Sequence, residues 1–88
     1  MTAETCILDE EIPNKLELEK ALALLTRWGH ITGPQYAALI RELEPHLPCL
    51  VMIEMKTKKG RVRVITAKPS GIARFSLDNR AKLIGQAN

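Results

Sequence analysis

Apolar side chains recur at helical spacing in the first half of the chain. They stand three or four positions apart at Leu18, Leu22, Leu25 and Trp28. This spacing is that of one face of an α-helix. Asn14 can cap the helix, with Glu17 three positions later as in a capping box, and Gly29 is a natural stop after the last turn. The pattern therefore predicts a helix between Asn14 and Gly29.

A second helix follows almost at once, and its start signal is stronger. Thr32 is expected to cap it, with Pro34 in the first turn and Gln35 at the capping-box position. One face of the segment is apolar, at Tyr36, Leu39, Ile40, Leu43 and Leu47. Pro45 and Pro48 then stop the helix, because proline cannot continue it. The two helices are expected to form a hairpin or corner with a shared apolar seam.

The pattern changes to the alternation of strands at residues 49–55 and 61–67. A four-residue turn over residues 57–60 keeps the apolar side chains of both strands on one face. It also places Glu54 opposite Arg63, and opposite charges across two strands stabilise the pair. A two-residue turn preserves the same faces but separates these charges. We therefore expect an antiparallel hairpin with the four-residue turn.

The other segments have weaker patterns. Residues 1–13 can form an arm or an edge strand. Residues 73–77 alternate and predict a short third strand or an irregular return along the sheet. Residues 78–88 have weak helical character and predict a short helix or a tail. The expected fold is one small α+β domain over residues 1–88, with two helices packed on a small antiparallel sheet built around the hairpin, in the order α-α-β-β.

Length and composition limit the class of protein. The 88 residues, 45% of them hydrophobic, suit one small globular domain. The longest apolar stretch, residues 49–53, is too short for a bilayer span, and the acidic N-terminal residues do not fit a signal peptide. We therefore expect a cytoplasmic protein with no membrane partner. Cys6 and Cys49 fit reduced thiols in that compartment.

Charge is separated along the chain. Residues 1–47 contain four basic and eight acidic side chains, a net of −4, whereas residues 48–88 contain nine basic and two acidic ones, a net of +7. Five of the nine cations fall within eight positions: Lys56, Lys58, Lys59, Arg61 and Arg63. The preferred hairpin places three of them opposite the apolar face and the other two at the turn. Cations concentrated in this way favour a polyanionic partner.

The leading hypothesis is a small non-enzymatic regulatory protein that binds DNA or RNA and forms a homodimer. The five hairpin cations would contact the phosphate backbone, with Lys68 and Arg74 extending the patch. A hairpin after two capped helices resembles the wing of a winged-helix domain over residues 14–67. Such a domain has three helices before its wing, and residues 44–48 are too short and proline-rich to supply the third. The three aromatic residues are few for a surface that stacks bases.

Other interpretations stay open. The charged hairpin can be a solvated edge that prevents strands of different molecules from pairing. The same surface, or the acidic first half, can bind a protein partner, as in an adaptor or an inhibitor carried by a mobile element. A dimerisation domain without a ligand is a further class. The apolar surplus of the first helix, which includes Leu16, Leu24 and Trp28, fits either a helix packed on two sides or a dimer interface.

Catalysis and metal binding find little support in the residue pattern. His46 and Cys49 are spaced like half of a zinc site, but Cys6 and His30 stand far from each other. The chain has no nucleophile elbow, no glycine-rich phosphate loop and no histidine–carboxylate arrangement that spacing identifies. Residues 68–71 have the composition of a turn. We therefore expect no enzymatic activity, no metal and no cofactor.

Overall fold

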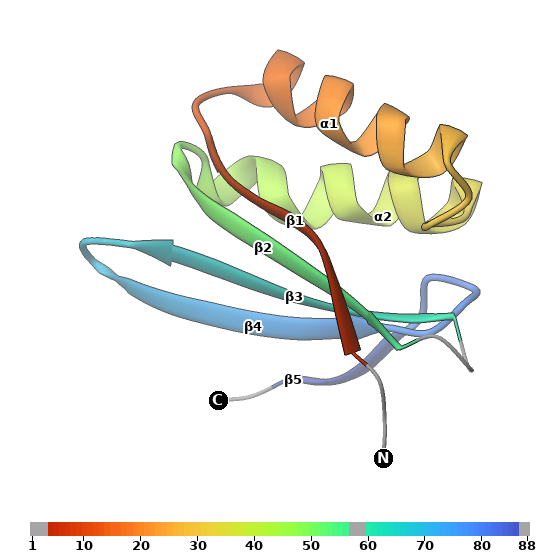
Figure 1. Ribbon diagram of the computed structural model, residues 1–88. Coiled ribbons are helices and arrows are strands. Elements are labelled where there is room, and N and C mark those ends of the chain that lie inside the picture. The colour runs from red at the N-terminus through yellow and green to blue at the C-terminus, as the bar shows by residue number, and fades with distance from the viewer. Residues whose placement is uncertain (1–3, 57–59, 87–88) are drawn as a thin grey trace.

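The fold consists of a helix pair on one face of a five-stranded antiparallel sheet (Figure 1). The structure, a computed structural model, describes residues 4–56 and 60–86. In chain order the elements are β1 (Glu4–Ile12), α1 (Lys15–Arg27), α2 (Gly33–Leu43), the short 3-10 helix η1 (Glu44–His46), β2 (Cys49–Lys56), β3 (Arg61–Lys68), β4 (Gly71–Leu77) and β5 (Leu83–Gln86). The strands are adjacent in sequence order, β1-β2-β3-β4-β5. Neither α1 nor α2 is long and apolar enough to cross a lipid bilayer.

The expected element order, α-α-β-β, was wrong, because a strand comes first and four strands follow the helices. In the segment 1–13, left open between an arm and an edge strand, the residues Glu4–Ile12 form β1. This strand pairs with β2 from Glu4 opposite Lys56 to Ile12 opposite Cys49. The long-range pairing decides its conformation, since the segment itself has no regular alternation that local sequence could reveal. Residues 73–77 do form a strand, which begins two residues earlier at Gly71.

The prediction of a short C-terminal helix within residues 78–88 was also wrong. The segment instead begins with a turn, in which the Asp78 carboxylate accepts hydrogen bonds from the backbone N–H groups of Arg80 and Lys82. Ala81 in this turn has a φ of 67°, which is outside the right-handed helical region. The chain then pairs with β4, with Leu83 opposite Leu77. Side-chain hydrogen bonds to the backbone are the usual competitor of a helix in such a segment.

Both predicted helix starts are confirmed. The Asn14 side chain accepts a hydrogen bond from the Glu17 backbone N–H at 2.9 Å. At the start of α2 the capping box is complete, because Thr32 and Gln35 each accept a hydrogen bond from the backbone N–H of the other. Gly29 follows α1 with a φ of 80°, the left-handed conformation that ends many helices.

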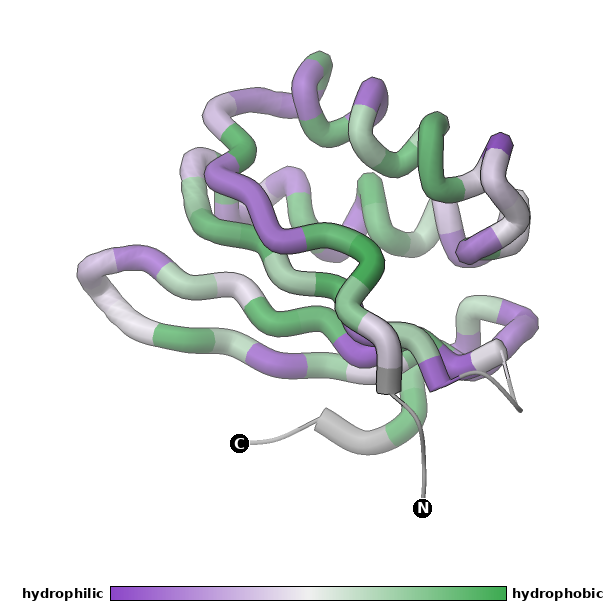
Figure 2. Tube along the Cα trace, in the orientation of Figure 1, coloured by the Kyte–Doolittle hydropathy of each residue, from purple (hydrophilic) through white to green (hydrophobic). Residues whose placement is uncertain are grey.

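The core lies between the helices and one face of the sheet. Hydrophobic and hydrophilic residues alternate along the elements that enclose it (Figure 2). The helices contribute Leu18, Leu22, Leu25, Ala38, Leu39 and Leu43, and the central strands contribute Val51, Ile53, Val62, Val64, Phe75 and Leu77, all buried. We call this the inner face of the sheet and the opposite one the outer face.

The predicted hairpin register is confirmed. Lys56 lies opposite Arg61, Glu54 opposite Arg63 and Ile53 opposite Val64, as the four-residue turn requires. Turn residues 57–59 lie outside the described residues. The hairpin is not a projecting wing, however, because β1 and β4 pair with its two outer edges. In this respect the hairpin differs from the wing of a winged-helix domain.

Candidate nucleic-acid interface

The outer face of the sheet carries its side chains in rows that cross the strands. Residues paired in an antiparallel ladder lie side by side on the same face, so the register defines each row. Four rows result: Lys56 and Arg61, with Glu4 at the register position next to Lys56; Cys6, Glu54, Arg63 and Ser76; Asp9, Met52, Ile65 and Arg74; and Glu11, Leu50, Ala67 and Ile72. We call the first two rows the cationic end and the last two the apolar end. The cationic end borders the β2–β3 turn.

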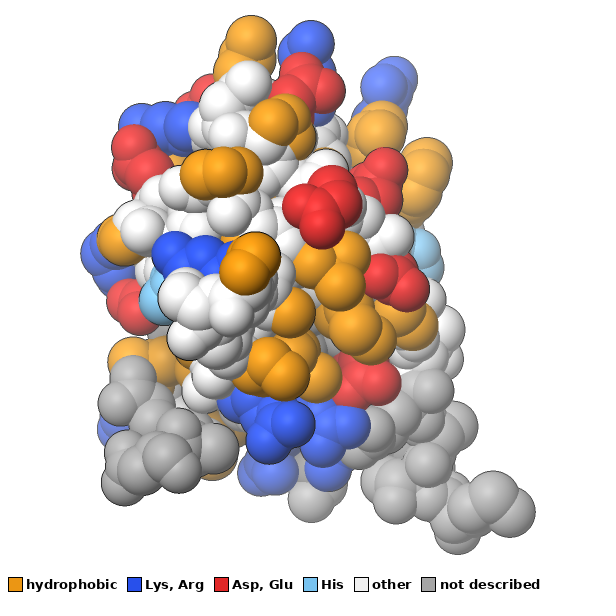
Figure 3. Space-filling view, turned by 90° about the vertical axis from the view of Figure 1, so that its left-hand side faces the viewer, with side chains coloured by type: hydrophobic (Ala, Val, Ile, Leu, Met, Phe, Trp, Pro, Cys, Tyr) orange, Lys and Arg blue, Asp and Glu red, His pale blue; other side chains and the backbone are white. Residues whose placement is uncertain are grey.

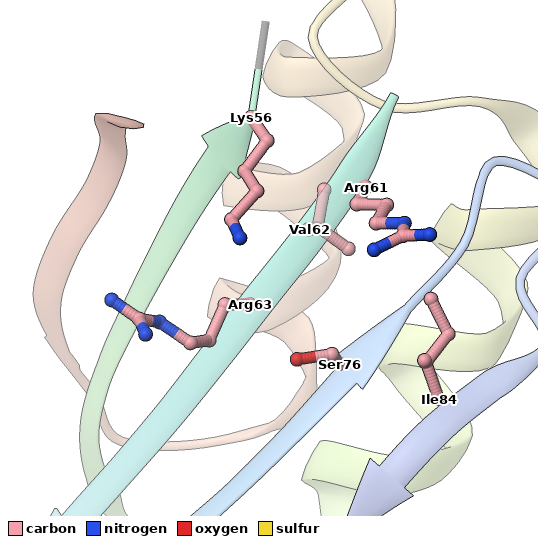
Figure 4. Close-up of a pocket in the computed structure, with 6 residues that line it drawn as sticks. All are labelled: Lys56, Arg61, Val62, Arg63, Ser76 and Ile84. Atoms are coloured by element: carbon pink, nitrogen blue, oxygen red, sulfur yellow. The ribbon is translucent and has the colours of Figure 1, made fainter. Parts of the chain in front are cut away.

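An open hollow lies at the cationic end (Figure 4). Its lining comes from four strands and consists of Lys56, Arg61, Val62, Arg63, Ser76 and Ile84. The hollow measures about 160 Å³. One water molecule needs roughly 10–15 Å³ on this measure, so the space admits an anion of the size of a phosphate group. Lysine and arginine side chains gather on the side of the sheet away from the helices in Figure 3 as well.

The cations around the hollow differ in their surroundings. Arg63 donates to Glu54 Oε1 from Nε at 2.9 Å and from Nη2 at 2.6 Å. This is the pair expected from the hairpin register, and it orients Arg63 toward β2. Figure 4 shows Arg61 pointing to the other side of β3. Among the described residues Arg61 has no acidic partner.

The structure brings together only part of the predicted cationic set. Lys56, Arg61 and Arg63 line one hollow, whereas Lys58 and Lys59 lie outside the described residues. Arg74 is exposed on the outer face but stands in the row of Ile65, at the apolar end.

Lys68 does not extend the cationic end. It lies at the far end of β3, and its Nζ donates to the backbone oxygen of His46 at 3.3 Å, on the side of the helices. The alternation of β3 contained this information, because Val64 and Thr66 are buried on the inner face and Lys68 follows at the same spacing. Proximity in sequence to the other cations was therefore misleading.

Sequence reasoning did not assign three residues of the hollow to the site: Val62, which was expected only on the core face, Ser76 and Ile84. Ser76 alternates with the buried Phe75 and Leu77, so its outward direction could be read from the sequence. Its place beside Arg63 could not, because this depends on the pairing of β3 with β4. Ile84 carried no usable signal, since β5 was not predicted as a strand.

The Gln35 side chain connects α2 to the two turns that border the cationic end. It is only 1% exposed. Its Nε2 donates to the backbone oxygens of Gly60 and Asp78, both at 2.8 Å, while Oε1 accepts from the Thr32 N–H at 2.9 Å. One amide thus connects the helix start with the end of the β2–β3 turn and the start of the β4–β5 turn.

The Asp78 carboxyl organises the β4–β5 turn, and its pKa is held below its ordinary value. The largest cause is the hydrogen bond from the Lys82 backbone N–H, and a second comes from the Arg80 N–H, both at 2.9 Å. The positive charges of Lys82 and Arg80 act in the same direction, whereas desolvation opposes them. The ionised carboxylate is therefore the form that the folded turn prefers.

A pH dependence follows for the Asp78→Asn variant. A carboxyl with a depressed folded pKa stabilises the protein above its unfolded pKa of about 3.9, and this contribution disappears as the pH falls through the folded pKa. We expect the native protein to be more stable than the variant at pH 7 and the difference to shrink below about pH 4. Urea unfolding at both pH values measures it. A difference that does not change with pH would contradict the role of the ionised carboxylate.

Candidate metal ligands are not brought together. Over the described ranges 4–56 and 60–86, no three His, Cys, Asp or Glu side chains are placed to hold one ion. Cys6 is exposed and Cys49 is buried, and both are free thiols. Burial raises the pKa of the Cys49 thiol, so this group stays protonated at neutral pH.

No protein-family model, curated protein sequence or solved structure matches the chain. The geometry of the outer face is therefore the basis for a proposal about function.

Proposed function

We propose that the chain is a non-enzymatic regulatory protein of the cytoplasm that binds the phosphate backbone of nucleic acid at the cationic end of the outer face. The observation that carries this proposal is the hollow that Lys56, Arg61 and Arg63 line together with Ser76. A phosphate group in the hollow would receive charge-assisted hydrogen bonds from the cations. The hydroxyl of Ser76 can donate a further one.

The register also supports an anionic ligand. Lys56 and Arg61 lie directly opposite each other, so one phosphate group can contact both cations. Nucleic acid adds a second favourable effect, because each phosphate that a cation neutralises releases condensed counterions.

The arrangement favours a duplex over a single strand. Phe75 is buried on the inner face, and Trp28 and Tyr36 belong to the helical side. The outer face therefore has no aromatic ring on which bases could stack, which single-strand binding surfaces use.

Sequence-specific readout of a duplex is not expected. The major groove, about 12 Å wide, admits a two-stranded ribbon. The β2–β3 hairpin is flanked by β1 and β4, and four strands at about 4.8 Å spacing exceed the groove. The contacts would then be made to phosphates, which position a protein without reading bases.

A salt series tests the proposal. We expect the full chain to bind generic duplex DNA, measured by fluorescence anisotropy, with an affinity that falls steeply as salt rises. Neutralising two contacts in the variant Lys56→Gln/Arg61→Gln should weaken binding and flatten the slope of log K against log[salt] by about 1.8. A single strand of equal length should bind more weakly, and duplexes of different sequence should bind alike.

The matched control is Lys15→Gln/Lys20→Gln, which removes the same net charge from exposed positions of α1. It should leave the slope nearly unchanged. Absence of binding at low salt, or an equal effect of both variants, would overturn the proposal. Absence of binding at low salt would favour a second candidate function, in which the outer face binds a protein. The observation that favours this function is the apolar end of the outer face.

A further inference from the structure

The apolar end of the outer face has an ordered distribution of charge. Its centre is formed by the partly exposed side chains Leu50, Met52, Ile65 and Ala67 on β2 and β3, and the strongly exposed Ile72 lies on β4. Asp9 and Glu11 stand on β1 at one side, and Arg74 stands on β4 at the other. Neither Asp9 nor Arg74 forms an ion pair within the described part of the chain.

We propose that a second copy of this chain covers the apolar end, with the two sheets packed face to face about a two-fold axis that runs parallel to the strands between β2 and β3. Rotation about this axis places β2 of one copy opposite β3 of the partner, and β1 opposite the partner's β4. Each row then faces the same row of the partner. Met52 then packs against the partner's Ile65, and Leu50 against the partner's Ala67. Both sheets bury the apolar surface that the helices leave uncovered.

Charge complementarity selects this axis. It places Asp9 opposite the partner's Arg74, and symmetry repeats the pair. A two-fold axis perpendicular to the strands would instead place Asp9 opposite the partner's Glu11, which is unfavourable because both are acidic. Packed sheets lie about 10 Å apart, a distance that an arginine side chain and an aspartate can span together.

The same axis makes the outermost row of the cationic end unfavourable for close packing. There Lys56 would face the partner's Arg61, and these two cations repel each other. The two hollows then lie at the same end of the dimer and form one continuous cationic surface. The dimer itself does not rest on the proposed nucleic-acid binding, since its contacts need no ligand.

The exposed stripe of α1 is the competing dimer surface. Leu16, Leu24 and Trp28 are 59%, 45% and 63% exposed. The lysines near this stripe already pair within the chain, Lys15 with Glu44 and Lys20 with Glu17. These lysines are therefore already paired, whereas Asp9 and Arg74 beside the apolar end of the sheet form no ion pair among the described residues.

Charge reversal tests the dimer without nucleic acid. We expect light scattering of the full chain to give twice the monomer mass, and Asp9→Arg or Arg74→Asp to raise the dimer dissociation constant at least tenfold. The combined variant Asp9→Arg/Arg74→Asp should restore the dimer. Within one copy these residues are three strands apart, roughly 14 Å at about 4.8 Å a strand, so restoration requires contact between two copies.

The control is Leu24→Lys on α1, which should leave the dimer intact. Circular dichroism confirms that each variant is folded. A monomer at all concentrations, no restoration by the combined variant, or loss of the dimer in Leu24→Lys alone would overturn the proposal. Because DNA is absent, these outcomes are separate from failure of nucleic-acid binding.

Discussion

Replacement of Gln35 by leucine is expected to lower the free energy of unfolding by about 2–4 kcal/mol. The buried amide makes three hydrogen bonds, to Thr32, Gly60 and Asp78. Leucine fills a similar volume but leaves these backbone groups without their partner, and an unsatisfied buried group costs about 1–3 kcal/mol. Urea unfolding followed by circular dichroism measures the difference.

Two further variants define the cause. Gln35→Glu keeps the acceptor toward Thr32 but replaces two donated hydrogen bonds by repulsion between a carboxylate and two carbonyl oxygens. It should therefore be at least as destabilising at pH 7, and less so in acid, where the protonated group can donate. Arg41→Leu at an exposed position of α2 should change stability by less than about 0.5 kcal/mol. Equal stability of Gln35→Leu and the native protein would contradict the bridging role.

Truncation of Leu22 to alanine is expected to destabilise the protein by about 2–5 kcal/mol. Its side chain is fully buried between α1 and the rest of the core. The loss combines the removed apolar surface with a cavity that the close-packed surroundings fill only in part. The same truncation at Leu16, on the same helix but 59% exposed, should stay within about 0.5 kcal/mol.

The comparison of the two leucines separates burial from helix propensity, because both changes introduce alanine into α1. If Leu22→Ala prevents folding, Leu22→Met replaces it in the comparison, since a substitution of similar volume costs less than about 1.5 kcal/mol. Equal effects at Leu16 and Leu22 would show that the assignment of the core face of α1 is wrong.

Local patterns predicted the elements whose signals are local. Asn14, Thr32 and Gln35 identify the helix starts because a capping hydrogen bond spans only three residues. The β2–β3 register was also predictable, since one short turn joins the strands and the Glu54–Arg63 pair favours a single alignment. By contrast, β1 and β5 obtain their conformation from strands that lie elsewhere in the sequence. Nothing within these segments specifies that pairing.

For the candidate site, the sequence by itself determined which face the hairpin cations occupy, because the two-residue period of a strand fixes the side of each residue. Tertiary structure alone decided that Ser76 and Ile84 complete the hollow and that Gln35 bridges the two turns. These features depend on strand order and on how the helices dock. Contacts between residues distant in sequence form only when the whole chain has packed, and no short pattern records them.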